Sequence, residues 1–383
     1  MTLIGAGTVV LDGQICRPGW LDIVGPRVTA CGAGAPPRDA DVDLPDAVVV
    51  PGFVDMHVHG GGGASYTDGR RADIARAVTF HRGHGTTTTL ASLVTAAPDA
   101  LLHAVRVLAD MTRQGAVAGI HLEGPWLSSA RCGAHDRNLL RPPGLAEIDA
   151  LLAAGDGAIR MVTLAPELPG SRAAIKRFVE AGVVVAIGHT DATYEEARQA
   201  ISAGVTVGTH VFNAMRPLHH REPGPALALL EDPRVTCELI ADGVHLHPAL
   251  VRQVIETAGS DRVALITDAM AAAGLADGAF RLGAVEVEVV DHVARVRGTS
   301  TIAGSTATMD RLFRTALEQF GSVDDRALLA AVHMTSATPA TAVGLDHVGR
   351  LRAGVDADLV VLDPDLRVAA VMAKGDWQGQ QPS

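Results

Sequence analysis

The sequence predicts an α/β protein: a (β/α)8 barrel of the TIM type, with a small β-sandwich domain formed by the N- and C-terminal segments. Two observations lead to this fold class. Short apolar segments alternate with amphipathic helical segments through the middle of the chain, and both ends of the chain read as short strands. We expect the barrel over residues 51–344 and the small domain over residues 1–50 plus 345–383, since 383 residues are enough for both.

Eight segments are candidates for the barrel strands. They span residues 53–59, 86–92, 118–123, 160–165, 183–188, 205–211, 236–240 and 263–267. Helical segments lie between several of them; Thr193 and Glu196, for example, belong to a capping box that opens a helix ending at Gly204. Eight strands with intervening helices is the count of a (β/α)8 barrel, although the spacing alone leaves a doubly wound sheet open.

The segments outside the barrel strands also carry clear signals. Residues 1–50 contain short β segments broken by Gly, Pro and Asp, and residues 349–375 are strand-rich again. Residues 279–298 read as hairpin material, and residues 305–343 read as mostly helical. We therefore expect the two β-rich ends to pair into one small domain.

Composition and charge exclude several classes of protein. With 48% hydrophobic and 20% charged residues the chain is not intrinsically disordered, and a net charge of −11 disfavours a nucleic-acid binder. A small anionic substrate needs only a local basic pocket. The four cysteines lie far apart without a CxxC pair, which indicates neither a disulfide framework nor a thiolate zinc site. The chain shows no signal peptide and no apolar run of membrane-spanning length, so we expect a cytoplasmic protein.

Ionisable side chains gather where the predicted strands end. His57 and His59 close the first strand, and strand alternation puts both on one face, where two imidazoles can share a metal ion. The alternative is a pair of polar residues hydrogen-bonded to their neighbours. Other strands end in further His and carboxylate residues, listed in order as His121 with Glu123, His189, His210 and Asp268. Five strands that deliver such groups to one rim predict a metal site, because their burial needs compensation.

Several motifs carry a resemblance to a known family. The segment PGFVDMHVHG at residues 51–60 resembles the opening of the amidohydrolase superfamily. The segments HLEGPWL, IGHTDATYEEA, GTHVFNAM, REPG, ADGVHLHP, LITDAM and IAGSTATM resemble the N-acetylglucosamine-6-phosphate deacetylases within it. The likeness runs over about residues 45–345. It implies hydrolysis of N-acetylglucosamine 6-phosphate to glucosamine 6-phosphate and acetate, in amino-sugar catabolism and cell-wall sugar recycling.

The resemblance implies a set of metal ligands. Glu123, His189 and His210 would hold the principal metal, and His57 with His59 would hold a second one, bridged by Glu123. Other members of the superfamily use a carbamylated lysine as the bridge, but no lysine lies near the predicted strand ends. The implied cofactor is one or two divalent metal ions per subunit, zinc foremost, with iron, manganese or cobalt as alternatives.

The resemblance also implies catalytic and substrate-binding residues. Asp268 would be the general base and acid, and His245 would orient the acetamide carbonyl and stabilise the oxyanion. The residues implied in binding the sugar phosphate are His135, Ala134, Asn213, Ala214, Arg221, His245 and Ile302. Arg221, in the REPG segment, would bind the phosphate held by the neighbouring subunit, which makes a homodimer the expected assembly.

Two points stay open. Cys132 stands in loop 131–138 where many relatives carry a lysine nearby; we favour a harmless substitution over altered loop contacts or a redox-sensitive thiol beside Arg131. The alternative function is another amidohydrolase reaction, such as cyclic amide hydrolysis or deamination, which would share the metals but not need Arg221. A non-catalytic scaffold is disfavoured because the implied ligands and Asp268 are all present.

Overall fold

The computed structural model describes residues 1–382, and the chain divides into two compact units. The first unit comprises Met1–Asp55, His81–Thr88 and the residues from Thr308 on; the second comprises Met56–Phe80 and Thr89–Ala307. The predicted boundary differs from this division because it assigns residues 308–344 to the barrel. The domain limits therefore stay a prediction.

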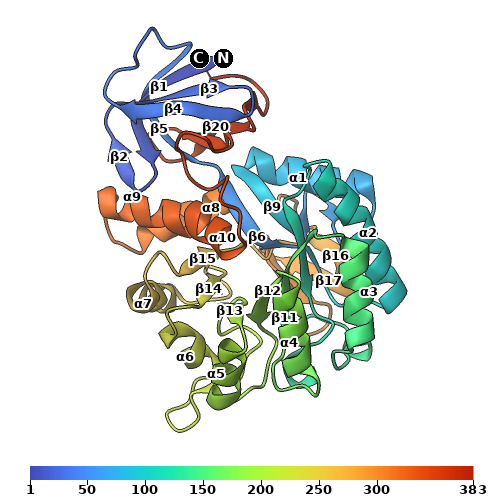
Figure 1. The fold of residues 1–383 in the computed structure, drawn as a ribbon. Coiled ribbons are helices and arrows are strands. Elements are labelled where there is room, and N and C mark those ends of the chain that lie inside the picture. Colours follow the sequence, from blue (N-terminus) through green and yellow to red (C-terminus); the bar gives the residue numbers. More distant parts are fainter. Residues whose placement is uncertain (383) are drawn as a thin grey trace. The chain divides into compact units, whose positions relative to one another are not determined.

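The larger unit is built on a sheet of eight strands that lie side by side in the order of the sequence (Figure 1). The strands are β6 (Phe53–Val58), β9 (Thr86–Leu93), β10 (Gly119–Glu123), β11 (Ile159–Leu164), β12 (Val184–Ile187), β13 (Val205–Gly208), β14 (Thr236–Leu239) and β15 (Val263–Leu265). Each coincides with one of the eight predicted segments. Neighbouring pairs from β9 to β15 run parallel, and the Asp268 N–H, just past β15, donates to the His57 carbonyl of β6 at 2.9 Å.

Helices follow most of these strands and cover the outside of the sheet (Figure 1). They are α1 (Arg71–Gly83), α2 (Pro98–Arg113), α3 (Leu145–Gly155), α4 (Ser171–Glu180), α5 (Tyr194–Ser202), α6 (Gly224–Glu231) and α7 (Pro248–Ala258). In α5 the predicted capping box is present: the Thr193 hydroxyl accepts from Glu196 N–H, and the Glu196 carboxylate accepts from Thr193 N–H. Strand, helix and strand thus alternate, which confirms the predicted (β/α)8 barrel.

A small antiparallel sheet follows the last barrel strand, where hairpin material was predicted. It consists of β16 (Gly278–Leu282), β17 (Val285–Val290) and β18 (Val293–Val296). Strand alternation turns Val287 and Val289 to one face, and both are buried in a cluster with Val94 and Met270. A second, two-stranded hairpin of β7 (Gly60–Gly61) and β8 (Ala64–Ser65) follows β6.

In the first unit, strands from both ends of the chain form one eight-stranded sheet. Its order is β21-β20-β19-β5-β1-β3-β4, with β2 paired to β1. The bounds are β1 (Thr2–Leu11), β2 (Gln14–Cys16), β3 (Gly19–Val24), β4 (Arg27–Ala33), β5 (Val42–Pro51), β19 (Leu359–Leu362), β20 (Val368–Ala373) and β21 (Asp376–Trp377). The pairing of the two β-rich ends is as expected from the sequence.

The same unit contains the predicted helical stretch after residue 305. Its helices are α8 (Met309–Glu318), α9 (Asp325–Val332), the π-helix η3 (His333–Ala337) and α10 (Thr338–Ala342). An ion pair between Arg17 and Asp325 (2.6 Å) and the contact of β2 with α9 join these helices to the terminal strands. These contacts explain why the helices group with the terminal sheet.

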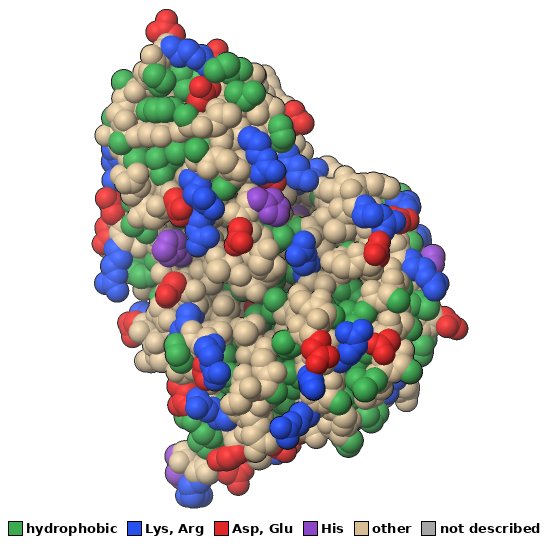
Figure 2. Space-filling view, in the orientation of Figure 1, with side chains coloured by type: hydrophobic (Ala, Val, Ile, Leu, Met, Phe, Trp, Pro, Cys, Tyr) green, Lys and Arg blue, Asp and Glu red, His purple; other side chains and the backbone are tan. Residues whose placement is uncertain are grey.

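Over residues 1–382, no helix is long and apolar enough to cross a lipid bilayer. The four cysteines are unpaired, as predicted. On the face shown in Figure 2, basic and acidic side chains are interspersed rather than gathered by sign. This distribution gives that face no broad basic patch of the kind that binds nucleic acid.

Candidate active site

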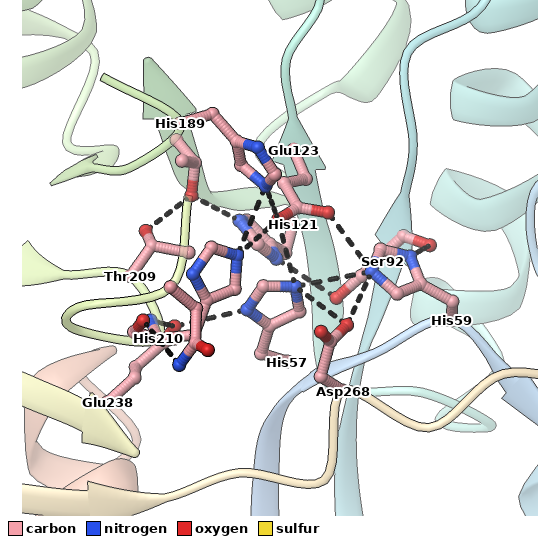
Figure 3. Close-up of polar contacts among 12 residues, drawn as sticks. His57, His59, Ser92, His121, Glu123, His189, Thr209, His210, Glu238 and Asp268 are labelled. Carbon is pink, nitrogen blue, oxygen red and sulfur yellow. Dashed lines mark hydrogen bonds and ion pairs between the residues drawn. The ribbon is translucent and has the colours of Figure 1, made fainter. Parts of the chain in front are cut away.

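The residues at the carboxyl ends of the barrel strands surround a cavity of about 730 Å³. In a parallel barrel these ends meet at one rim, which is why side chains far apart in the sequence converge there. Predicted site residues that line the cavity are His59, Glu123, Ala134, His135, His189, His210, Asn213, Ala214, His245, Asp268 and Ile302. His57 lies beneath it, fully buried, in contact with His59 (Figure 3).

Glu123, His189 and His210 form the tightest group (Figure 3). Glu123 Oε1 lies 3.0 Å from His189 Nε2 and 3.0 Å from His210 Nε2, and the two nitrogens are 3.1 Å apart. The His189 Nδ1–H donates to the Arg131 carbonyl at 3.0 Å, which directs Nε2 toward Glu123. Ligands bound at about 2.0 Å around a tetrahedral metal lie roughly 3.3 Å apart, so this donor set has the size of a zinc-like site.

A second group of four buried side chains shares Glu123. His59 Nε2 lies 3.1 Å from Glu123 Oε2 and 3.1 Å from Asp268 Oδ1. His57 Nε2 lies 3.2 Å from His59 Nε2, and 3.5 Å from both Glu123 Oε1 and Asp268 Oδ1. These four residues are close enough to hold one ion. Because Glu123 turns one oxygen to His59 and the other to His189 and His210, it connects the two groups.

The electrostatics of the cluster favour a cation between its side chains. Burial lowers the pKa of His57 and His59, but the surrounding carboxylates outweigh it, so the pKa of His57 lies well above its usual value and that of His59 rises to about 9. Burial raises the pKa of Asp268, yet His57 and His59 hold it at about 2. Burial also raises the pKa of Glu123, but the neighbouring histidines, His57 and His135 foremost, hold it well below its usual value. The carboxylates of the cluster therefore stabilise a positive charge, which a proton or a metal ion can supply. The histidine and carboxylate donors fit a divalent metal.

The backbone at this rim is unusual. His189, His210 and Asp268 each follow a barrel strand with a positive φ, of 47°, 28° and 47°. Such conformations are strained for residues with a Cβ, and they persist where surrounding contacts hold them. At Asp268 the neighbouring Ser305 N–H donates to its carbonyl at 2.7 Å. The strained turns aim the three side chains into the cavity.

His245 stands on the loop after β14 and is held by one carboxylate. Asp242 Oδ2 accepts from His245 Nδ1–H at 2.8 Å, while Oδ1 accepts from the N–H groups of Val244 and His245 at 2.9 Å each. Burial lowers the pKa of His245, but the hydrogen bond that it donates to Asp242 outweighs burial, so the pKa is raised. In its protonated form, which Asp242 favours, His245 carries a hydrogen on both ring nitrogens and can donate from Nε2 to the cavity that it lines.

His135 enters the cluster from loop 131–138. Its Nδ1 contacts Thr95, with Oγ1 at 2.8 Å and the N–H at 3.3 Å, and its Nε2 lies 3.4 Å from Glu123 Oε2. Distance alone would also allow Glu123, His135 and His189 to hold an ion. Cys132, on the same loop, lines the cavity as well, and its thiol lies 3.7 Å from the Gly133 carbonyl.

Among the described residues, 1–382, the predicted site residues outside the cavity lining are His57, directly beneath it, and Arg221. Arg221 is exposed on the loop between β13 and α6, which projects from the barrel unit (Figure 1), and its Nη1 contacts His220 Nε2 at 2.7 Å. On the inner part of this loop, Arg216 pairs with Asp191 at 2.9 Å, and Asp191 also pairs with Arg131 at 2.9 Å. One carboxylate thus ties together the loops that follow β10, β12 and β13.

A buried polar network beneath the cluster was not predicted. His121 bonds Ser92 and Thr163 (2.9 and 2.8 Å), and Thr163 bonds Thr209 (2.8 Å). Burial sets the pKa of His121 well below normal, so it is a neutral structural residue. Glu238 accepts from His57 Nδ1–H at 3.0 Å. The available signal was a lone glutamate inside the apolar segment TCELI at residues 236–240.

Comparisons with known proteins show the family to which the chain belongs. The family model described as "Amidohydrolase family" matches residues 48–378. N-acetylgalactosamine-6-phosphate deacetylase of Escherichia coli O157:H7 is 36% identical over 369 residues, covering 94% of this chain and 96% of the relative. N-acetylglucosamine-6-phosphate deacetylase of Lysinibacillus sphaericus is 34% identical over 331 residues, covering 85% and 84%.

A solved structure gives the same result. A mutant of N-acetyl-D-glucosamine-6-phosphate deacetylase from Mycobacterium smegmatis, in complex with N-acetyl-D-glucosamine-6-phosphate, is similar at a TM-score of 0.97 and 55% identity, over 99% of both chains. The chain is a member of the amidohydrolase family, and its resemblance to the N-acetylglucosamine-6-phosphate deacetylases of that family is confirmed.

Proposed function

We propose that this protein hydrolyses N-acetylglucosamine 6-phosphate to glucosamine 6-phosphate and acetate. The observation that carries the proposal is a cavity of about 730 Å³ in which a cluster of His, Glu and Asp side chains faces His245, in a chain 55% identical to a deacetylase that binds this sugar phosphate. The relatives favour this reaction over cyclic amide hydrolysis and over deamination.

The amidohydrolase family is metal-dependent, and the His, Glu and Asp cluster is able to bind a metal ion. We assign Glu123, His189 and His210 to the principal metal, and His57 and His59 with bridging Glu123 to a second. Zinc is the first candidate, with iron, manganese or cobalt as alternatives, because nitrogen and oxygen donors suit all four. When bound, the cation supplies Lewis acidity toward an amide carbonyl and toward water.

Two side chains then divide the proton transfer and charge stabilisation. Asp268 is ionised, so it accepts a proton as water adds to the carbonyl carbon and returns it to the amine nitrogen as the C–N bond breaks. His245 donates a hydrogen bond to the carbonyl oxygen, where negative charge develops. The Asp242 carboxylate keeps its ring in that orientation.

The sugar and its phosphate occupy the rest of the cavity. His135 and Ala134 contact the sugar from loop 131–138, and Ile302 lies on the opposite wall. Asn213 and the backbone of Ala214 contact the phosphate end. Arg221 supplies a guanidinium to the site of a second copy, which fits its exposure on a projecting loop away from its own cavity. The assembly we propose is therefore a homodimer.

An acetate-release assay on purified protein of measured metal content tests this function. We expect release from N-acetylglucosamine 6-phosphate and much slower release from the unphosphorylated sugar. N-acetylgalactosamine 6-phosphate belongs in the same assay because one relative is named for it. No acetate from either phosphorylated sugar with metal present would overturn the proposal.

The ligand assignment has its own test. His189→Ala and His210→Ala each remove one of three mutually contacting ligands, so we expect metal content and turnover to fall together by orders of magnitude. Elemental analysis and acetate release on the same preparations measure both quantities. Full turnover in a variant or preparation without metal would show that these histidines have another role.

A further inference from the structure

Glu238 is a buried carboxylate that contacts two candidate metal ligands at once. It lies on β14 with no exposed surface, and its Oε2 accepts from His57 Nδ1–H at 3.0 Å and from the His210 N–H at 3.3 Å (Figure 3). Its other oxygen, Oε1, makes no hydrogen bond within residues 1–382. A charged group is kept in such surroundings only where its contacts compensate for lost hydration.

The contact with His57 determines which ring nitrogen faces the site. With Nδ1–H committed to Glu238, Nε2 is the atom that points toward His59, Glu123 and Asp268. The Nδ1–H groups of His59 and His189 donate instead to the carbonyls of Ser92 (3.2 Å) and Arg131 (3.0 Å). Of these three rings, His57 is therefore the one held by a side-chain carboxylate rather than by a backbone carbonyl, and the position of that carboxylate fixes its orientation.

The contact with His210 acts on the backbone. His210 has a φ of 28°, a strained conformation for a residue with a side chain, and its Nδ1 makes no hydrogen bond within the described chain. Its orientation therefore depends on how its main chain is held. Glu238 accepts from the N–H of this residue, and the Glu238 carbonyl accepts from the next N–H, that of Val211, at 2.9 Å.

We propose that Glu238 is a positioning residue that aligns His57 and His210, one ligand from each of the two metal positions, through a single carboxylate oxygen. The role rests on the proposed function, since it concerns the metal that the cluster would hold. The proposal predicts that the position of this side-chain oxygen affects metal binding more than its charge does. Glu238→Gln keeps an oxygen at the same distance, whereas Glu238→Asp keeps the charge but withdraws it by one methylene.

The experiment measures zinc directly as well as catalysis. Purified wild-type protein and the Glu238→Gln, Glu238→Asp and Glu238→Leu variants are stripped with chelator and titrated with zinc against a chromophoric competitor. Cobalt(II) forms report coordination through their visible spectra, and ¹⁵N NMR reports the tautomer of His57. Cys237→Ala is the control, because it alters the preceding residue of the same strand, whose side chain points to the other face.

We expect zinc affinity to fall by about 10- to 100-fold in the Asp and Leu variants and by less in the Gln variant, with an altered cobalt spectrum. Turnover should fall in the same order, while KM changes little because Glu238 does not line the cavity. Unchanged zinc affinity and an unchanged His57 tautomer in the Asp variant would overturn the role. If Leu prevents folding, the comparison of Asp with Gln decides. Wild-type protein that binds no zinc and no cobalt would instead contradict the proposed function.

Discussion

Asp268 is largely buried and carries a negative charge held in place by two histidines. We expect Asp268→Asn to keep the fold and much of the substrate affinity, since the amide has nearly the same shape. Turnover should fall by about 10²- to 10⁴-fold because the amide cannot accept the proton. Steady-state kinetics on N-acetylglucosamine 6-phosphate give both kcat and KM.

Asp99→Asn is a suitable control, because it changes an exposed carboxylate in the first turn of α2. A variant of Asp268 that kept most of the wild-type rate would move the role of base to another group. His135 would be the next candidate, since it lies 3.4 Å from Glu123 in the same cavity.

Asp358, in the unit that contains the terminal strands, allows a test of how the free energy of unfolding depends on pH. Burial raises its pKa to about 6, although the Lys374 N–H donates to it at 2.7 Å. Because the folded pKa is raised, its favourable contribution is complete at a pH below the unfolded value of about 3.9 and is lost as the pH rises through about 6. Above that pH the ionised carboxylate is destabilising by roughly 3 kcal/mol, at about 1.4 kcal/mol per pKa unit.

We therefore expect Asp358→Asn to increase the free energy of unfolding at about pH 8 more than at about pH 5. Urea denaturation at both values measures the difference, with exposed Asp365→Asn as the control. An equal effect of Asp358→Asn at both pH values would mean that the carboxyl does not titrate in this range.

The sequence predicts individual residues best where a motif and a strand end coincide. His57, His59, Glu123, His189, His210 and Asp268 were all predicted at one rim, and the structure brings them together there. Glu238 was missed because its partner His57 is 181 residues away, and a single acidic residue in an apolar strand does not show which side chain it meets. The roles of all these residues stay predictions until variants are measured.

At the scale of elements, Asp191 connects the loops that follow β10, β12 and β13, and its substitution tests whether this connection matters. Its carboxylate pairs with Arg131 and Arg216 at 2.9 Å each. Two partly exposed pairs contribute together about 0.5–2 kcal/mol, so we expect Asp191→Asn to raise KM for the sugar phosphate by about two- to tenfold. The effect on kcat should be smaller, since no group that transfers a proton is touched. Hydrogen exchange should quicken in residues 129–138.

Asp149→Asn removes an ion pair of similar length, with Arg177 at 2.6 Å, between α3 and α4. It should leave KM as in the wild type. Equal kinetics for the Asp191 and Asp149 variants would indicate that the loops are held by their other contacts.

Elements with a strong local signal were predicted, and elements formed by tertiary context were not. All eight barrel strands were found because each is a short apolar run between turn residues. The hairpin of β7 and β8 and the π-helix η3 were not foreseen, since a run of glycines and one extra residue in a helical turn leave little pattern. Helix bounds agreed closely where a capping box was present, as in α5.

At the scale of the whole molecule, the proposed role of Arg221 in binding phosphate can be tested by comparing a phosphorylated with an unphosphorylated substrate. Arg221→Ala removes a group worth about 1.5–3 kcal/mol to a bound phosphate, so we expect KM for the phosphorylated sugar to rise at least about tenfold. Hydrolysis of unphosphorylated N-acetylglucosamine should change little. Kinetics on both sugars measure the contrast.

Mixing subunits tests whether Arg221 acts between copies. Asp268→Asn and Arg221→Ala proteins are dissociated, mixed and reassociated, so that one site in a hybrid dimer has an intact Asp268 and an Arg221 from its neighbour. Partial return of activity is expected. Hybrids that form but stay inactive would place Arg221 within its own subunit or outside the reaction, and a monomer in solution would contradict the dimer itself.

The fold class was predictable from the sequence, and the limits of the two domains stay a prediction. The predicted barrel, residues 51–344, includes residues 308–344, which by their contacts belong to the unit of the terminal strands. In the structure they pack with residues of the N-terminal segment, for example through Arg17 and Asp325. Such pairings between distant residues leave no trace in local composition.

The pairing of β5 with β19 has a consequence for synthesis on the ribosome. Val48–Pro51 of β5 align with Leu359–Leu362, so β5 is synthesised before the barrel strands and its partner β19 after them. Until then β5 has an open edge, and open edges promote association between nascent chains. We infer that a chain truncated before Leu359 keeps this edge of β5 open and associates with other copies more readily than the full chain.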